Sequence, residues 1–251
     1  MKENLHFLKN SQIIVLGLCI ALATVASSLI LSRALIQIKK FSTEVISVTG
    51  SGERKIRSDY MVWTARFSRR DPQMTAAYQK LKEDVQSVKH YLTAHGIAEN
   101  EMILSPVQTE TLYFKNEKGG DTNQIEAYRL IQSVEIRSRD VDKVTNVSRE
   151  STELIYQGIE FISASPQYFY TRIAEPKLEM LAEASQNAKK RAEQMAASTG
   201  NKTGFMRSAR MGVFQITPVN SVDVSDWGEN DTQSLEKKVM AVVKVDFAIR
   251  G

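Results

Sequence analysis

The longest apolar run of the chain lies near its N-terminus. Residues 13–32 are twenty residues without a charge, between Lys9 and Arg33. As a helix this run is about 30 Å long, which matches the hydrocarbon core of a bilayer. A cleaved signal peptide is the alternative, because small residues at 21 and 23, or at 24 and 26, suit a signal peptidase. The apolar character continues past those positions, so we favour an uncleaved transmembrane anchor within residues 1–41.

The charges that flank this run give only a weak orientation signal. Lys2 and Lys9 precede it, and Arg33, Lys39 and Lys40 follow it. Taken literally, the positive-inside rule places the large domain in the cytoplasm, by a margin of one residue.

The pattern changes to strands and amphipathic helices after residue 42. Residues 45–48 predict a short strand that ends at a Gly50-Ser51-Gly52 turn, and residues 60–69 alternate as a half-buried strand does. A helix follows from Asp71-Pro72, with apolar residues at spacings of three and four, and Gly96 ends it.

The middle of the chain predicts a compact sheet with helices on one face. Strands are expected near 102–114 and 125–137, a second helix begins at Asp140, and another strand follows Gly158. Residues 60–166 therefore have the order β-α-β-β-α-β, which is ferredoxin-like and antiparallel. The predicted fold class is α+β.

The last third adds a long helix and terminal strands to this sheet. The helix is expected over 171–199, with a small-residue stripe that includes Ala182, Ser185, Ala188 and Ala192 and permits close packing. Strands are expected near 204–216 and 239–249. The segment between them is polar and acidic, with Asp223, Asp226, Glu229 and Asp231 around Trp227. Loops of this length are usually functional or disordered. Trp227 is a candidate contact residue, although it could also fold back on its own domain.

Composition argues against a nucleic-acid partner. The net charge of +4 comes from residues 1–41, and residues 42–251 hold 28 basic and 28 acidic residues. A basic footprint is therefore absent from the predicted domain.

No catalytic motif emerges from the residues that could carry chemistry. A dinucleotide fingerprint would need glycine where Lys55 stands, and a P-loop would need Gly-Lys-Ser/Thr where Gly52 precedes Glu53. His90 and His95 point about 140° apart on a helix, and Cys19, the only cysteine, lies in the apolar run. We therefore expect no catalytic residue, no cofactor and no metal, and a protein that is not an enzyme.

Several segments resemble the SIMPL-domain family in order and spacing. They are "ISVTGSGERKIRSDY", "AAYQKLKEDVQSVKHYLTAHGI", "GIEFISAS", "LAEASQNAKKRAEQMAASTGNKTG" and "MAVVKVDFAI", and together they span about residues 42–250. The resemblance implies a bacterial envelope protein of poorly defined function. It also implies ring or channel-like oligomers and a link to oxidative or envelope stress resistance, and it carries over no catalytic residue. The resemblance favours a domain that faces outward, in the periplasm, on an inner-membrane anchor. We give this more weight than the opposite orientation, which a charge margin of one residue favours.

The expected function is thus a non-enzymatic, single-pass membrane protein whose domain, residues 42–251, self-associates. Neutral charge and exposed strand edges favour association of copies. The candidate contact residues are Val45, Val48, Gly50, Gly52, Ala188, Ala192 and Trp227. Ordinary folding is the alternative role for each of them. The alternative function is a membrane-tethered binding or sensing module for an envelope partner or a small ligand, with Trp227 in the contact.

Overall fold

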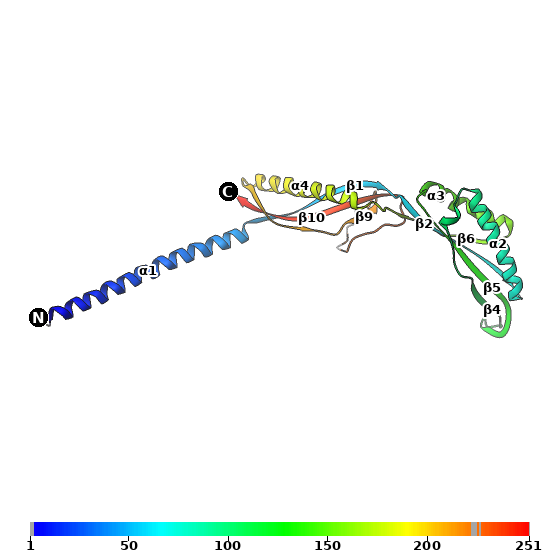
Figure 1. Ribbon diagram of the computed structural model, residues 1–251, viewed down its shortest axis with the longest axis horizontal. Coiled ribbons are helices and arrows are strands. Elements are labelled where there is room, and N and C mark those ends of the chain that lie inside the picture. The colour runs from blue at the N-terminus through cyan, green and yellow to red at the C-terminus, as the bar shows by residue number, and fades with distance from the viewer. Residues whose placement is uncertain (1–2, 222–224, 226, 251) are drawn as a thin grey trace. The chain divides into compact units, whose positions relative to one another are not determined.

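The protein combines helices with antiparallel sheets, so the predicted α+β class is confirmed. The terminal strands, however, do not extend the central sheet as predicted but form a second sheet with β1 (Val45–Arg57). The computed structural model describes residues 3–221, 225 and 227–250 (Figure 1). Asp223 and Asp226 of the predicted acidic loop lie outside the described residues. The residue contacts form two compact units, one of residues 1–51, 183–211 and 242–251 and the other of residues 52–182 and 212–241.

The N-terminal helix α1 (Glu3–Thr43) is 41 residues long. Its segment Val15–Lys39 has a mean hydropathy of 2.3, and none of that segment is buried by the rest of the chain. Such a helix is long and apolar enough to cross a membrane, and a signal sequence has the same character. Because no protein surface covers its apolar side chains, lipid is the environment that suits them.

The larger sheet is built around two long central strands. Its order is β3-β5-β2-β6, with β4 also paired to β5 and β7 also paired to β2, and every pair is antiparallel. The strands are β2 (Tyr60–Asp71), β3 (Met102–Leu104), β4 (Gln108–Lys115), β5 (Asp121–Ser138), β6 (Glu160–Ser163) and β7 (Gln167–Phe169). The alternation predicted for residues 60–69 is confirmed, because Met61, Trp63, Ala65 and Phe67 are all buried.

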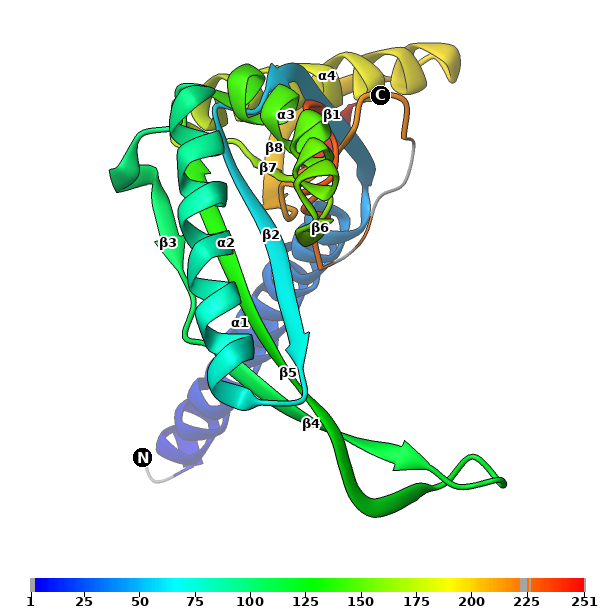
Figure 2. The same ribbon diagram turned by 90° about the vertical axis from the view of Figure 1, so that its right-hand side faces the viewer.

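Two helices pack on that buried face and form the main core. Figure 2 shows α2 (Met74–Ala94) lying along β2 and β5. Leu81 and Val88 of α2 meet Trp63 and Phe67 there, together with Val144 from α3 (Val141–Glu150). The predicted start of α3 is confirmed, because the Asp140 carboxylate accepts a hydrogen bond from the Lys143 backbone N–H at 3.2 Å. Short 3₁₀ turns, η1 (Glu99–Glu101) and η2 (Ser151–Gln157), complete the connections.

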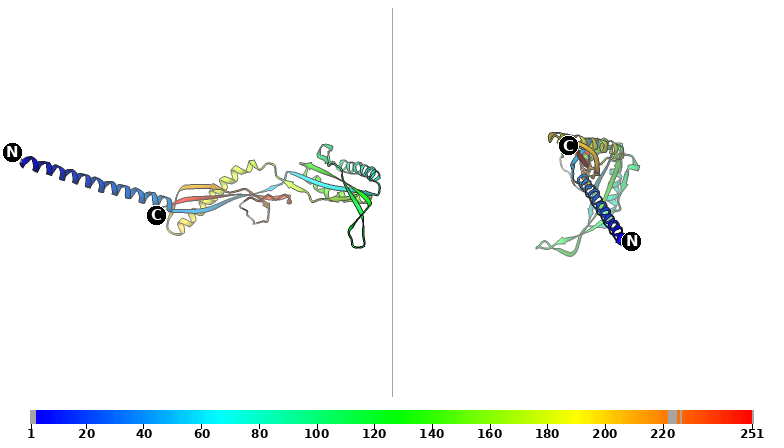
Figure 3. Two further views of the ribbon diagram at one scale, coloured as in Figure 1. Left: turned by 90° about the horizontal axis from the view of Figure 1, so that it is seen from below. Right: turned by 90° about the vertical axis from the view of Figure 1, so that its left-hand side faces the viewer.

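The smaller sheet has the order β1-β10-β8, and β9 pairs with β10 beside it (Figure 3). Its strands are β1 (Val45–Arg57), β8 (Lys202–Met211), β9 (Gln215–Pro218) and β10 (Glu236–Arg250). The strand predicted over 204–216 is therefore two strands, which pair with different parts of β10. Likewise, the strand predicted over 102–114 is divided into β3 and β4. Pro106 lies in the break and has no N–H to donate.

The predicted Gly50-Ser51-Gly52 turn is wrong, because β1 continues through it as one 13-residue strand. Neither glycine has a positive φ. A Cβ on Gly50 would stand 2.1 Å from the Ala184 carbonyl oxygen and 2.5 Å from the Ala188 nitrogen. Glycine is needed there because the strand lies directly on the backbone of a helix.

That helix is α4 (Ala174–Ser198), which presents small residues to the sheet. Its buried residues recur every four positions: Met180, Ala184, Ala188, Ala192 and Ala196. The predicted stripe is correct at Ala188 and Ala192 but wrong at Ala182 and Ser185, which are exposed. The Arg191 guanidinium also donates to the Thr49 carbonyl at 3.1 Å, and the Ser51 N–H donates to Asn187 Oδ1 at 3.3 Å.

Candidate functional site

The segment that carries Trp227 is pinned to β9 by one buried amide. Gln215 is 2% exposed, and its Nε2 donates to the Ser225 carbonyl at 2.6 Å while its Oε1 accepts from the Glu229 N–H at 2.7 Å. The backbone of Ile216 makes two further hydrogen bonds to the loop. The Ile216 N–H donates to the Glu229 carbonyl at 2.7 Å, and the Ile216 carbonyl accepts from the Asp231 N–H at 2.9 Å. The described part of this loop therefore has a defined position on the strand.

This pinning displays the indole of Trp227 to solvent. The residue is 92% exposed, so it does not fold back on its own domain. Gly228 follows with φ at +90°, and a Cβ on it would stand 2.7 Å from Val213 Cγ1. Only glycine tolerates both the positive φ and the close approach of Val213 without strain, so the loop geometry beside Trp227 depends on Gly228.

A groove of about 400 Å³ lies beside Trp227. Its wall is mainly aromatic and aliphatic, and a few charged or polar side chains interrupt it. The aromatic and aliphatic residues are Phe169, Tyr170, Ile173, Val213, Phe214, Ile216 and Trp227, and the polar ones are Lys177, Glu229, Asn230 and Lys237. Apolar walls with a few placed polar groups are the usual composition of ligand sites.

Lys237 is the unusual member of this lining. It is 1% exposed, and its ammonium donates to the carbonyl of Tyr168 at 2.6 Å and to the carbonyl of Asp231. Burial lowers the pKa of Lys237, and the negative charge of Asp231 opposes that shift. The side chain thus ties β10 to β7 and to the Trp227 loop, and it keeps a cation in a poorly hydrated place.

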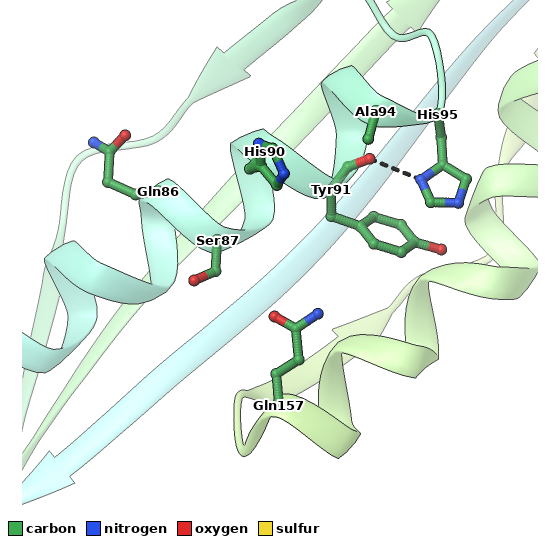
Figure 4. Close-up of a pocket in the computed structure, with 7 residues that line it drawn as sticks. All are labelled: Gln86, Ser87, His90, Tyr91, Ala94, His95 and Gln157. Carbon is green, nitrogen blue, oxygen red and sulfur yellow. Dashed lines mark hydrogen bonds between the residues drawn. The ribbon is translucent and has the colours of Figure 1, made fainter.

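A second cleft, of about 380 Å³, lies between the end of α2 and Gln157 (Figure 4). His95 Nδ1 donates to the Tyr91 carbonyl at 2.8 Å, and the two rings have centroids 4.1 Å apart. Burial raises the pKa of the Tyr91 hydroxyl, and the charges of Glu153 and Glu150 raise it further. Figure 4 shows Tyr91 between His90 and His95, and no group of three metal-ligating side chains is found among the described residues. None of the residues that line this cleft carries a carboxylate or an ammonium group.

A family model matches residues 46–247 of the chain, which is most of its length. The chain belongs to the SIMPL family. The family is described as proteins of unknown function (DUF541). The resemblance seen in the sequence is thereby confirmed. Both clefts lie within the matched residues, and so does the smaller sheet except for the first residue of β1 and the last three residues of β10.

The SIMPL fold has distant likenesses among solved structures. An uncharacterized conserved protein from Listeria innocua shares 11% identity, over 76% of this chain and 92% of its own, with a TM-score of 0.20. A hydrolase from the same organism shares 10% identity over 85% of this chain and 96% of the hydrolase, with a TM-score of 0.17. A second hydrolase from that organism shares 14% identity over 82% of this chain and 95% of the hydrolase, with a TM-score of 0.19. No curated protein sequence matches the chain. Likenesses this weak carry no argument about activity.

Most of the residues predicted to contact a second copy of the SIMPL domain are buried within the fold of a single copy. Val48, Gly50, Gly52, Ala188 and Ala192 are buried, and the contact of β1 with α4 accounts for Gly50 and Ala188. Val45 is half-buried, and Trp227 is exposed. The structure therefore assigns the first five to packing within the chain, and a surface for a second copy has to be sought elsewhere.

Sequence reasoning missed two features of this SIMPL domain. The first is that β8, which was predicted as part of a strand, is an edge strand with exposed apolar side chains: Phe205, Met206 and Met211 are 70%, 61% and 63% exposed. The second is the groove, whose lining comes from two separate segments of the chain, 169–177 and 213–237. The one available signal for Lys237 was the alternation of β10, because Lys237 lies two residues before Val239 and therefore on the buried face of the strand.

Proposed function

We propose that this SIMPL protein is a non-enzymatic membrane-anchored protein whose folded domain associates with copies of itself through β8. The observation that carries this proposal is a ten-residue edge strand with large exposed apolar side chains. Among the described residues, β8 pairs only with β10, so its other edge offers backbone N–H and C=O groups for pairing.

The two edges of the smaller sheet explain why we propose a ring. β1 and β8 form opposite edges and differ in sequence. A contact of β8 with the β1 edge of the next copy is head-to-tail, and such contacts close into rings when the rotation between copies allows it. A contact between identical edges would instead end at a dimer.

Light scattering of the full chain in a mild non-ionic detergent tests this proposal. The wild type is expected to have one discrete mass of several chains. The double variant Met206→Lys, Met211→Lys is expected to be a monomer, because charged edges resist strand pairing. Tyr156→Lys is the matched control, since Tyr156 is 94% exposed and lies outside β8. A monomeric wild type, or a variant with the mass of the wild type, would overturn self-association through β8.

The proposed location is a bacterial inner membrane, with the domain in the periplasm. The apolar helix α1 supports the anchor, and the outward orientation and the link to stress resistance rest on the family resemblance alone. The proposed lack of an enzymatic activity rests on the sequence, in which no catalytic motif emerges. A stoichiometric metal or nucleotide in natively purified protein would contradict it.

A second candidate function is a membrane-tethered binding module that uses Trp227. The exposed indole on a pinned loop favours this candidate, because rigid aromatic side chains at a groove are typical contact residues. Trp227→Ala should abolish capture of an envelope partner and leave the oligomer mass unchanged. Tyr156→Ala removes another exposed aromatic side chain as a control. Unchanged capture by Trp227→Ala would remove this candidate.

A further inference from the structure

We propose that the groove beside Trp227 binds a small organic anion, a carboxylate on a flat apolar body. This inference rests on the binding-module candidate and names the class of its ligand. The apolar body would lie against the aromatic wall, and the carboxylate would face the lysines of the lining. Three features of the groove support this assignment: its size, its charge and the occupation of its aromatic rings.

The size and wall of the groove suit a single ring with a short chain. A volume of about 400 Å³ is at the lower end of the range for small-molecule sites. Phe169, Phe214 and Trp227 provide flat surfaces, and Trp227 is almost fully open to a ligand. Burial of such a ring against aromatic side chains removes apolar surface from water and favours stacked or edge-on contacts.

The charge of the lining favours an anion. Lys177 and Lys237 outnumber Glu229, and among the described residues Lys177 has no carboxylate within ion-pair distance. The Lys177 ammonium lies over the Phe214 ring, 5.2 Å from its centroid, so it stands at the aromatic wall. A carboxylate at that wall would gain a partner without displacing an existing ion pair.

Lys237 adds a positive charge below the surface of the groove. Two of its donors are used by backbone carbonyls, and burial disfavours its charged form. The Asp231 carboxylate offsets part of that charge, but its Oδ1 accepts from the Gln233 and Ser234 N–H groups at 2.8 and 3.2 Å. A bound carboxylate would stabilise the charged form of Lys237, because its negative charge opposes the burial that lowers the pKa of this ammonium.

A cationic ligand fits the same aromatic residues less well. Aromatic rings attract cations, but the chain already supplies cations to two of these rings. Lys177 lies over Phe214, and the Arg172 guanidinium lies 6.0 Å from the centroid of the Tyr170 ring. A ligand cation would meet these charges at close range, whereas an anion would complement them.

Fluorine NMR of the full chain in a neutral detergent, labelled with 5-fluorotryptophan, tests the proposal. The chain has two tryptophans, Trp63 and Trp227, and the first is fully buried in the main core, so its signal is an internal control. The probes are phenylacetate, its neutral isostere phenylacetamide, and the cation phenethylamine. Phenylacetate is expected to shift the Trp227 signal saturably, at the lowest concentration of the three, and to leave the Trp63 signal in place.

Lys177→Met is the decisive variant, because Lys177 is exposed and its replacement should not disturb folding. It is expected to weaken phenylacetate binding about fivefold and to leave phenylacetamide binding unchanged. Lys118→Met, in the exposed connection between β4 and β5, is the matched control and should bind as the wild type does. Added salt should weaken binding of phenylacetate alone.

Four results would overturn the inference. They are no shift of the Trp227 signal with any probe, equal affinity for phenylacetate and phenylacetamide, a higher affinity for phenethylamine, and phenylacetate binding that Lys177→Met leaves unchanged. The binding-module function is judged separately by its partner-capture assay. If Trp227-dependent capture persists while phenylacetate fails, only the ligand class is wrong.

Discussion

Single residues decide how closely the backbone segments of this protein approach one another. Gly50 lets β1 lie on the backbone of α4, and Gly228 allows the turn that displays Trp227. The sequence indicated that the glycines at 50 and 52 were special but could not say why. A glycine in a turn and a glycine under a helix look alike until the packing partner, here 134 residues later, is known.

Gly50→Ala should therefore destabilise the domain markedly. Its methyl group would collide with backbone atoms of Ala184 and Ala188, which cannot rotate away as a side chain can. We expect a loss of at least about 2 kcal/mol in the free energy of unfolding, measured by urea denaturation. Gly120→Ala is the control. Its nearest neighbour is the flexible Asn116 side chain at 3.2 Å, so the loss should stay below about 1 kcal/mol. Equal losses would show that β1 does not pack this closely.

Asp59 is one of the residues through which acid should weaken the fold. Burial alone would raise its pKa, but hydrogen bonds from the Thr171 N–H at 2.7 Å, from the Arg172 guanidinium and from the Thr171 hydroxyl outweigh that effect. Its pKa in the folded protein is thus lowered. Its contribution is present above the unfolded-state pKa and is lost as pH falls through the lower, folded-state value.

Urea denaturation between pH 6 and pH 2 measures this contribution. The wild type should lose stability below about pH 4, where aspartate in the unfolded chain begins to be protonated. Asp59→Asn should be less stable at pH 6 and should lose less stability on acidification. If the variant loses as much stability on acidification as the wild type, Asp59 does not contribute to the acid dependence of folding.

At the scale of elements, the hydrophobic period and the approximate length of helices and strands were predictable. The positions at which strands are divided, and the face that α4 buries, were not. The alternation of β2 and the start of α3 at Asp140 follow from local patterns, and both are confirmed. The stripe of α4 recurs every four residues, so a stripe drawn with mixed spacings places Ala182 and Ser185 on the wrong side. The separation of β8 from β9 depends on which part of β10 each strand meets, and no local pattern records that.

A pair of alanine substitutions on α4 tests the assigned face. Ala188→Leu should cost about 1–3 kcal/mol in the free energy of unfolding, because Ala188 is fully buried beside Gly50. Ala182→Leu places the same side chain on the exposed face of the same helix and should change stability by less than about 0.5 kcal/mol. Thermal denaturation of both variants measures the two losses of stability. A larger loss at Ala182 than at Ala188 would mean that the opposite face of α4 is buried.

At the scale of the whole molecule, the sequence predicted an apolar N-terminal helix and an α+β SIMPL domain. It also singled out Trp227 as a candidate contact residue, because a lone aromatic residue in a polar loop is visible locally, but it did not predict that the indole is exposed. The rest of the groove was not predictable, since Tyr170, Phe214 and Lys237 come from separate segments that meet only in the fold. The edge of β8 was missed for the same reason, because a strand is an edge only when its neighbours are known.

The most direct test of the account is the N-terminal sequence of the protein recovered from carbonate-washed membranes. An anchored SIMPL protein predicts that the chain stays in the washed membrane and begins at residue 1 or 2, with α1 intact. A soluble chain that begins just after residue 23 or 26 would contradict the account, because residues 13–32 would then be a removed signal and the domain would be free of the membrane.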